Sequence, residues 1–214
     1  MELKKQKTYQ GVFERAREEL TSGAMENKFI LAGLRYEQKK TDTLVHVPFF
    51  DETITLTIPV FSFKSSKSTN INLVTKIIVL HYINNASGAP FAGDKVAYGD
   101  IPACMHYDPV FEKRVLRPLV NAFGNDKYAF LEAGRTMGAK EEVFGDASFT
   151  LFAFPKVPIT FILWEGDGEF PPSAKALFDS SITGYLPLED IVIIAKLAAG
   201  RILKTAIKKY ADEV

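Results

Sequence analysis

Segments with the alternation of β-strands occur in adjacent pairs in this sequence, and this arrangement limits the folds open to the chain. Val45, Val47 and Phe49 alternate with Leu44, His46 and Pro48, and threonine alternates with Ile or Leu through residues 53–58. Asp51 and Glu52 lie between the two segments. A second pair, residues 143–154 and 157–164, is rich in Phe, Ile, Thr and Val. Adjacent strands favour antiparallel hairpins over parallel βαβ units. We therefore predict an α+β fold, in which antiparallel strand pairs pack against several helices.

The segments around these strands have the apolar spacing of helices. Helices are predicted at about residues 7–22, 71–87, 109–123, 126–137 and 188–210. Residues 95–98 read as a short strand, and Pro171 and Pro172 are predicted to open a short helix through Ala174, Leu177 and Phe178, because proline is tolerated in a first helical turn. The helix that begins near residue 71 is apolar on most of its circumference, which predicts an interior position.

Length and charge point to one globular domain over residues 1–214. A chain of 214 residues with 47% hydrophobic residues can bury roughly 70% of its unfolded surface, and the sequence has no repeat or linker. The 26 basic residues balance the 26 acidic ones, so the chain has no global attraction for nucleic acid. The common P-loop, zinc-protease, thiol-redox and serine-hydrolase motifs do not occur. We predict no nucleic-acid partner.

The single cysteine, Cys104, has no partner for an internal disulfide, which fits a reducing cytoplasm. No apolar core follows the basic residues near the N-terminus, so a secretory signal is not predicted. The longest apolar stretch, residues 191–199, includes Lys196 and is far shorter than the roughly 20 residues that span a bilayer. We predict a cytoplasmic protein without a membrane span.

Three carboxylates alternate after the second strand pair. In an extended backbone, Glu165, Asp167 and Glu169 would project to one side at intervals of about 7 Å. Such a cluster suits a hard cation or an acid and base pair. A solvated turn that leaves the strand is the simpler interpretation, because matches this short recur by chance.

Cys104, His106 and Asp108 also alternate. A thiol beside an imidazole suits an activated nucleophile or a soft-metal site, provided that both side chains point the same way. The structural interpretation is that Asp108 caps the helix that follows and that Cys104 is a small buried residue. We favour the structural interpretation.

His81 lies late in the apolar helix that begins near residue 71. A lone imidazole there is more often a hydrogen-bonded core residue than a ligand. The sharper hypothesis is an axial ligand of a tetrapyrrole metal, since haem iron takes a histidine in an apolar pocket. The 17 Phe and 8 Tyr residues provide material for the walls of such a pocket, although they also suit an ordinary core.

The order of several short motifs resembles a bacterial and archaeal family known only as domain of unknown function 3786. The likeness covers roughly residues 70–195. It rests on Leu80-His81-Tyr82, Phe111, Arg114, Pro118-Leu119, Phe123-Gly124, Gly145-Asp146, Pro155-Lys156-Val157-Pro158, Asp167-Gly168-Glu169-Phe170-Pro171, Leu177-Phe178-Asp179, Tyr185-Leu186 and Glu189-Asp190.

The resemblance implies no established catalytic role. It implies an anaerobic context, in which some members resemble accessory proteins of corrinoid or iron-sulfur metabolism. Relatives with an added cysteine-rich module differ from this chain, which has Cys104 alone. The resemblance and His81 together suggest a binding or accessory protein for an apolar or tetrapyrrole cofactor, either corrinoid or haem.

The cofactor is expected between the His81 helix and residues 164–179. The predicted contacts are His81, Tyr82, Trp164 and Phe178. The alternative is a small metal-assisted or acid-base enzyme that uses Glu165, Asp167, Glu169 and Asp179. A structural or oligomer-forming role is a third option, and we favour binding over catalysis.

Overall fold

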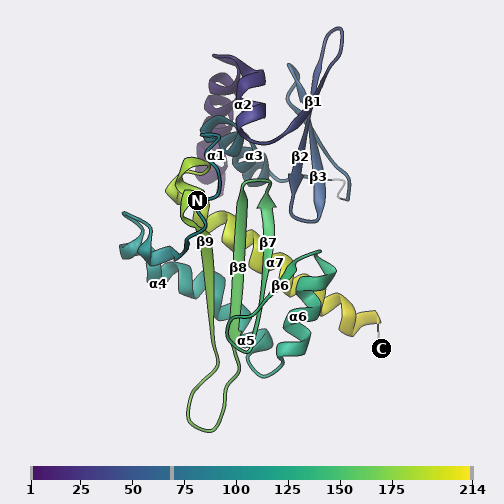
Figure 1. Ribbon diagram of the computed structural model, residues 1–214. Helices are drawn as coiled ribbons and strands as arrows, with labels where there is room; N and C mark the ends of the chain where they lie inside the picture. Colours follow the sequence, from purple (N-terminus) through teal and green to yellow (C-terminus); the bar gives the residue numbers. More distant parts are fainter. Residues whose placement is uncertain (1, 68–69, 213–214) are drawn as a thin grey trace. The chain divides into compact units, whose positions relative to one another are not determined.

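The computed structural model describes residues 2–67 and 70–212. The chain combines helices with two antiparallel sheets (Figure 1), which confirms the predicted α+β class. It divides into two compact units. The first comprises the described residues up to Pro90 with Phe154–Lys156 and Ser181–Pro187, and the second comprises Phe91–Ala153, Val157–Ser180 and the described residues from Leu188 onward. A domain is a part of a chain that can fold alone. The single domain expected from the sequence stays a prediction.

Short strands form the sheet of the first unit, in the order β1-β2-β3-β4. They are β1 (Arg35–Gln38), β2 (Thr43–Phe49), β3 (Glu52–Ile58) and β4 (Ser62–Ser65). Alternate side chains of β2 are buried, and the antiparallel register sets Val45 opposite Leu56 and Val47 opposite Ile54. The first predicted hairpin is therefore confirmed.

The described helices of the first unit include α1 (Glu2–Thr21), α2 (Met25–Leu31) and α3 (Leu73–Asn85). Helix α3 buries Ile78, Leu80 and Tyr82 among other side chains around its circumference. The predicted, mostly interior position of this helix is confirmed, because more than half of its residues are buried.

Tyr82 of α3 is fully buried and both hydrogen-bonding functions of its hydroxyl are used. The hydroxyl donates to the Ala32 carbonyl oxygen at 2.6 Å and accepts from the Lys156 backbone N–H at 3.2 Å. Its ring stacks on that of Phe154, with centroids 4.2 Å apart. Burial raises the pKa of the Tyr82 hydroxyl above its ordinary value, so the group is neutral at physiological pH.

The second unit contains the other sheet, in the order β5-β9-β8-β7-β6. Its strands are β5 (Lys95–Ala97), β6 (Lys140–Glu142), β7 (Ala147–Phe154), β8 (Val157–Trp164) and β9 (Ser173–Asp179). Its helices include α4 (Asp108–Phe111), α5 (Arg117–Phe123), α6 (Lys127–Thr136) and α7 (Leu188–Asp212), with shorter turns at η1 (Tyr98–Asp100), η2 (Met105–Tyr107) and η3 (Glu112–Leu116). In Figure 1, α7 passes behind the sheet.

Aromatic rings connect the helices of the second unit to its sheet. The ring of Phe130 on α6 lies 5.5 Å from that of Phe123 on α5 and 4.6 Å from that of Phe149 on β7, measured between centroids. Phe149 in turn lies 6.2 Å from Phe161 on β8. These separations lie in the range of favourable aromatic pairs, so the chain of rings forms the core between sheet and helices.

The prediction of a short helix after Pro171 is wrong, because the segment forms strand β9. Its residues pair with β8 from Ser173 opposite Trp164 to Phe178 opposite Ile159. Phe178 is fully buried between β8 and β5, opposite Val96. Pairing with β8, and with β5 at the last three residues of this strand, overrides the local preference that the two prolines suggest. Proline is also tolerated just before a strand.

The remaining predicted elements are confirmed within a few residues, while α2, β1, β4 and β6 were not predicted. These four elements have three to seven residues each, so a periodic pattern has little room to develop in them. Among the described residues, no helix is long and apolar enough to cross a membrane.

Candidate functional site

A cleft of about 490 Å³ lies in the second unit, between the beginning of β9 and the helical segment that runs from α4 to α5. We call it the Tyr98 cleft. Its walls are residues 172–176 on one side and residues of η1, α4, η3 and α5 on the other. The residues that line it are Ala97, Tyr98, Asp108, Phe111, Glu112, Leu116, Arg117, Val120, Pro172, Ser173, Ala174, Lys175 and Ala176.

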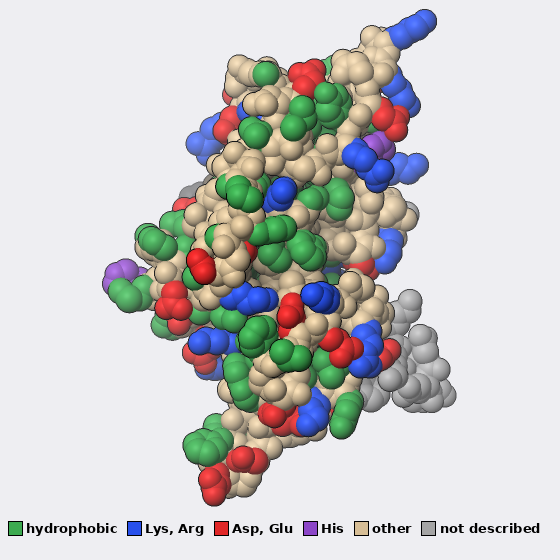
Figure 2. Space-filling model, in the orientation of Figure 1, with side chains coloured by type: hydrophobic (Ala, Val, Ile, Leu, Met, Phe, Trp, Pro, Cys, Tyr) green, Lys and Arg blue, Asp and Glu red, His purple; other side chains and the backbone are tan. Residues whose placement is uncertain are grey.

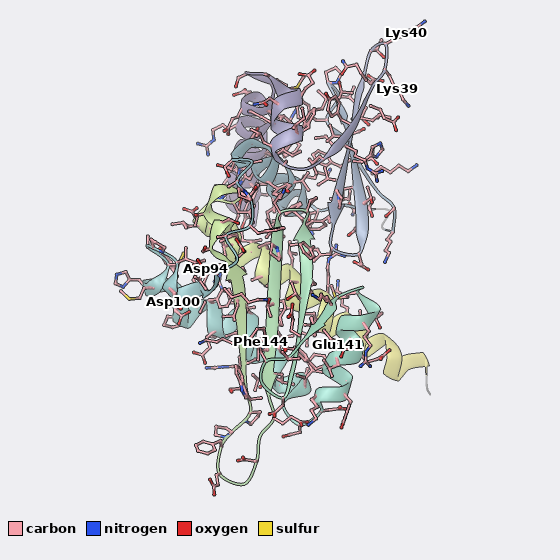
Figure 3. All side chains as sticks on the ribbon, in the orientation of Figure 1. Lys39, Lys40, Asp94, Asp100, Glu141 and Phe144 are labelled. Atoms are coloured by element: carbon pink, nitrogen blue, oxygen red, sulfur yellow. The ribbon has the colours of Figure 1, made fainter. Side chains whose placement is uncertain are left out.

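The strand side of the Tyr98 cleft is an edge of the sheet. Strand β5 pairs only with the last part of β9, from Ala97 opposite Leu177 to Lys95 opposite Asp179. After Ala97 the chain turns into η1, within the segment between the labelled Asp94 and Asp100 in Figure 3. Consecutive residues from Ser173 to Ala176 line the cleft. Since successive side chains of a strand point to opposite faces, a lining of consecutive residues means that the strand edge itself borders the cleft.

The helical side contains a π-helical turn, η3, within an otherwise continuous helix. Its last hydrogen bond runs from the Arg117 backbone N–H to the Glu112 carbonyl, five residues earlier. Pro118 follows at once and has no N–H to donate to the residue four positions before it. The α-helical ladder is therefore interrupted at this point, and wider turns of this kind are frequent at functional sites.

Tyr98 and Phe111 form an aromatic floor in the cleft. Tyr98 is 3% exposed and Phe111 is 1% exposed. Burial raises the pKa of the Tyr98 hydroxyl above its ordinary value, and a hydrogen bond with the Cys104 thiol raises it further. Tyr98 therefore stays neutral through the physiological range, and Cys104 is a buried partner of this hydroxyl rather than an exposed thiol.

The structural interpretation of Cys104 is favoured by these contacts. Its neighbour in the predicted pair, His106, is exposed in η2. Asp108 does not cap α4 in the structure; its carboxyl group lies instead beside Gly99, on which an added Cβ would be 3.0 Å from the carboxyl carbon.

Four charged side chains of both signs line the Tyr98 cleft. Asp108 and Glu112 are acidic, and Arg117 and Lys175 are basic. All four residues are exposed, and in the part of the chain that the structure describes none of them forms an ion pair. Charges of both signs are also interspersed over the face shown in Figure 2. The cleft can thus offer both cationic and anionic groups to a ligand.

A second cleft of about 600 Å³, the Trp164 cleft, lies at the loop between β8 and β9. It includes three of the residues that the sequence singled out: Trp164, Glu165 and Asp167. Trp164 is 37% exposed at the end of β8, and Phe170 in the loop is 68% exposed. Lys175 borders this cleft as well as the Tyr98 cleft.

The carboxylates of the Trp164 cleft are engaged in holding the loop. Glu165 accepts a hydrogen bond from the Lys127 backbone N–H at 3.0 Å, and its second oxygen lies 3.2 Å from the Lys127 ammonium. A carboxylate at this place complements the N-terminus of α6. It also raises the pKa of the Lys127 ammonium. The Glu165 side chain therefore anchors the strand end to a helix.

Asp167 closes a turn within the loop. One of its oxygens accepts hydrogen bonds from the backbone N–H groups of Phe170 and Glu169, at 2.7 and 2.8 Å. These two bonds lower the pKa of the Asp167 carboxyl group, because they favour its charged form. This geometry is that of the solvated turn which the sequence analysis named as the simpler interpretation.

Asp179 lies at the other end of β9 from the Trp164 cleft, six residues beyond Ser173. Its two oxygens accept hydrogen bonds from the Ala92 and Gly93 backbone N–H groups, each at 2.9 Å. Glu169 does not line the Trp164 cleft. Among the described residues, no group of three or more His, Cys, Asp or Glu side chains is placed to hold a metal ion. A metal site at Glu165, Asp167, Glu169 and Asp179 stays a prediction.

The four predicted cofactor contacts belong to different units. His81 and Tyr82 lie on α3 in the first unit, and Trp164 and Phe178 lie on β8 and β9 in the second. Tyr82 and Phe178 are core residues, both 0% exposed. Phe178 meets the edge of the Phe111 ring at 6.0 Å between centroids. Neither unit by itself brings the four side chains together, and a cofactor at these residues stays a prediction.

Apart from Asp108, which was noted beside Cys104 and His106, the charged residues of the Tyr98 cleft were missed because they share no motif. One local signal was present: Pro118 interrupts a predicted helix, and an interior proline indicates a break or kink. Lys175 gave no signal, since the segment that carries it was predicted to be helical.

Comparison with known families identifies the chain's relatives. The model of the family described as domain of unknown function (DUF3786) matches residues 30–201, so the chain belongs to this family. The match begins well before the region from residue 70 in which the sequence motifs were noted. No curated protein and no solved structure matches the chain.

Proposed function

We propose that this member of the DUF3786 family is a binding protein, and that its ligand occupies the Tyr98 cleft and carries both a positive and a negative charge. The observation that supports the proposal is the set of four charged side chains, two of each sign, around one cleft. Asp108 and Glu112 suit a cationic group, and Arg117 and Lys175 suit an anionic one. Complementary charges of this kind give a binding site its specificity and its orientation of the ligand.

The floor of the cleft supports binding over catalysis. The Tyr98 hydroxyl has a raised pKa, whereas a general base works best with a pKa near the operating pH. A neutral hydroxyl on an apolar, stacked ring pair suits a site in which a few polar groups fix the orientation of a ligand. Tyr98 is thus assigned a supporting role in the wall of the site.

Calorimetric titration with 8-aminooctanoate tests the proposal, because this compound has an ammonium group, a carboxylate and no amide. Octylamine and octanoate, which carry one charge each, serve as comparators. We expect the doubly charged compound to bind more tightly than either comparator. The substitutions Asp108→Asn and Arg117→Ala should each lower the affinity of the protein for 8-aminooctanoate by about ten-fold, which corresponds to about 1.4 kcal/mol.

Matched controls lie on elements that border the cleft, but their residues do not line it. Asp100→Asn on η1 is the control for Asp108→Asn, and Lys113→Ala on η3 is the control for Arg117→Ala; both residues are exposed. These controls should bind 8-aminooctanoate as the unaltered protein does. The proposal is wrong if 8-aminooctanoate does not bind, or if the cleft variants and the controls bind it equally.

The ligand class suggested by the sequence, a corrinoid or haem cofactor in anaerobic metabolism, stays the alternative. The feature that favours it is Trp164, which is partly exposed on the wall of a cleft. Addition of haem or cobalamin should then change the visible absorption spectrum, and His81→Ala should weaken that change. An unchanged spectrum with both compounds would exclude this alternative.

A further inference from the structure

The vacant edge of β9 points to the chemical class of the ligand. We infer that the Tyr98 cleft binds a short peptide with a free N-terminus, which adds to β9 as an extra antiparallel strand. This inference rests on the proposed function, since it concerns the same cleft, and it adds the recognition of a peptide backbone to the recognition of charge.

The backbone of β9 provides the first argument. Residues Ser173–Ala176 pair with β8 on one side, while β5 on the other side ends opposite Leu177. In an antiparallel pair, alternate residues turn both their N–H and C=O groups away from the partner strand. Within the described chain, none of these four residues makes a backbone hydrogen bond outside its strand pairing. An extended peptide in the cleft can satisfy these groups, as in other complexes where a peptide adds a strand to a sheet.

The end of β5 provides the second argument, because it fixes where a bound peptide begins. A new strand on this edge would lie in line with β5, and the place directly before it is filled by Ala97 and Tyr98. A peptide that runs in the direction of β5 therefore has its first residue near Tyr98. A free amino terminus fits this position, whereas a longer chain before it would meet η1.

The charges on the helical wall of the cleft provide the third argument, since they are ordered along β9. Asp108 lies beside Gly99, next to the end of β5. The helical segment then follows the strand toward its beginning, where an added Cβ on Gly124 would lie 2.7 Å from the Pro172 Cβ. Along the helical wall, the acidic Asp108 thus lies at the end of the cleft near Tyr98. The basic Arg117, nine residues after Asp108, lies further toward the beginning of β9.

This order matches a peptide that runs antiparallel to β9. Its N-terminal ammonium would face Asp108 and Glu112, and its C-terminal carboxylate would lie toward Arg117. The four residues of β9 that have no partner on the side of β5 span about 13 Å at roughly 3.3 Å per residue. A peptide of about four residues fills this length, so both of its charged ends fall within the cleft.

Titration with tetraalanine tests the inference, because this peptide combines the two charged termini with amide groups and has small side chains. We expect it to bind at least about ten-fold more tightly than 8-aminooctanoate. Acetylation of its N-terminus should lower affinity by about ten-fold. Asp108→Asn should weaken the binding of tetraalanine but not of the acetylated peptide, which no longer has the ammonium group. Asp100→Asn is again the control.

Hydrogen exchange distinguishes the pairing of a peptide backbone with β9 from the binding of charged groups alone. Tetraalanine should slow the exchange of alternate backbone N–H groups between Ser173 and Ala176, and 8-aminooctanoate should not. A tetraalanine with methylated amide nitrogens should lose both the protection and the additional affinity. If tetraalanine binds no more tightly than 8-aminooctanoate, or protects none of these groups, the peptide inference is overturned while the proposed function stands. If neither compound binds, both are overturned.

Discussion

The ring of Tyr98 lies nearly parallel to the ring of Phe111, with centroids 4.5 Å apart and planes inclined by 6°. The two residues come from η1 and α4, and each is almost completely buried. The stack therefore couples the turn after β5 to the helical wall of the Tyr98 cleft. Its energetic contribution can be measured at the Phe111 side without removing the Tyr98 hydroxyl.

Replacement of Phe111 by alanine should destabilise the protein strongly. Removal of a buried phenylalanine side chain lowers the free energy of unfolding by about 3–5 kcal/mol. Water should also reach Tyr98, so the pKa of its hydroxyl should fall toward the ordinary value. Urea unfolding and ultraviolet titration of tyrosine measure the two effects. Phe170→Ala is the control, because Phe170 is 68% exposed and its removal should change stability by no more than about 0.5 kcal/mol.

Replacement of Tyr82 by phenylalanine should cost about 1–3 kcal/mol of stability at neutral pH, because the Ala32 carbonyl and the Lys156 N–H lose their common partner. The pH dependence follows from the raised pKa of Tyr82. An unfolded tyrosine loses its proton near pH 10, whereas the buried hydroxyl keeps it. The stabilisation is therefore complete below about pH 10 and is lost as the pH rises further.

The stability difference between Tyr82→Phe and the unaltered protein should accordingly shrink when both are measured above that pH. Urea unfolding at a series of pH values from neutral to alkaline provides the comparison. A difference that stays constant throughout the alkaline range would contradict the assignment of a raised pKa to Tyr82.

Two helical glycines of the second unit should respond in opposite directions to alanine. An added Cβ on Gly134 in α6 would lie 2.6 Å from the Phe149 ring, whereas nothing lies within 4 Å of one on Gly200 in α7. Gly134→Ala should lower the free energy of unfolding by about 1–3 kcal/mol through overpacking. Gly200→Ala should raise it by about 0.5–1 kcal/mol, because alanine restricts the unfolded chain. Thermal unfolding of the pair distinguishes packing from helix propensity.

Replacement of Ala103 by glycine should raise the free energy of unfolding. Its φ of 67° lies in the left-handed region, which is unfavourable for a residue with a Cβ and open to glycine. Ala103→Gly should therefore stabilise the protein by about 1 kcal/mol. Ala122→Gly, in the regular helix α5, should destabilise it by about 0.5–1 kcal/mol. Equal signs for the two substitutions in urea unfolding would contradict the strained conformation at Ala103.

The parts of the fold that could be predicted are those whose pattern is local. The buried position of helix α3 could be predicted because apolar residues occupy most of its circumference. The hairpin of β2 and β3 could be predicted because residues of two kinds alternate along β3 and a turn precedes it. Strand β9 could not be predicted in this way. Its residues are fixed by partners at Trp164 on one side and Val96 on the other, and such long-range pairing leaves no signature in a window of seven residues.

The same distinction applies to the candidate sites. Glu165 and Asp167 attracted notice because they alternate, yet their main contacts hold a helix end and a turn. Asp108, Arg117 and Lys175 belong to three separate elements, and only the correct assignment of β9 brings them to one cleft. Because β9 was predicted to be a helix, the sequence could not indicate the Tyr98 cleft.

The path of the chain through the two units sets a limit on how the protein can be divided. Residues Phe154–Lys156 and Ser181–Pro187 return to the first unit from within the second, and they bring Phe154 and Lys156 to the side chain of Tyr82. A gene fragment that stops near Pro90 would encode α3 without these contacts. One cut in the gene therefore cannot yield either unit with all of its segments.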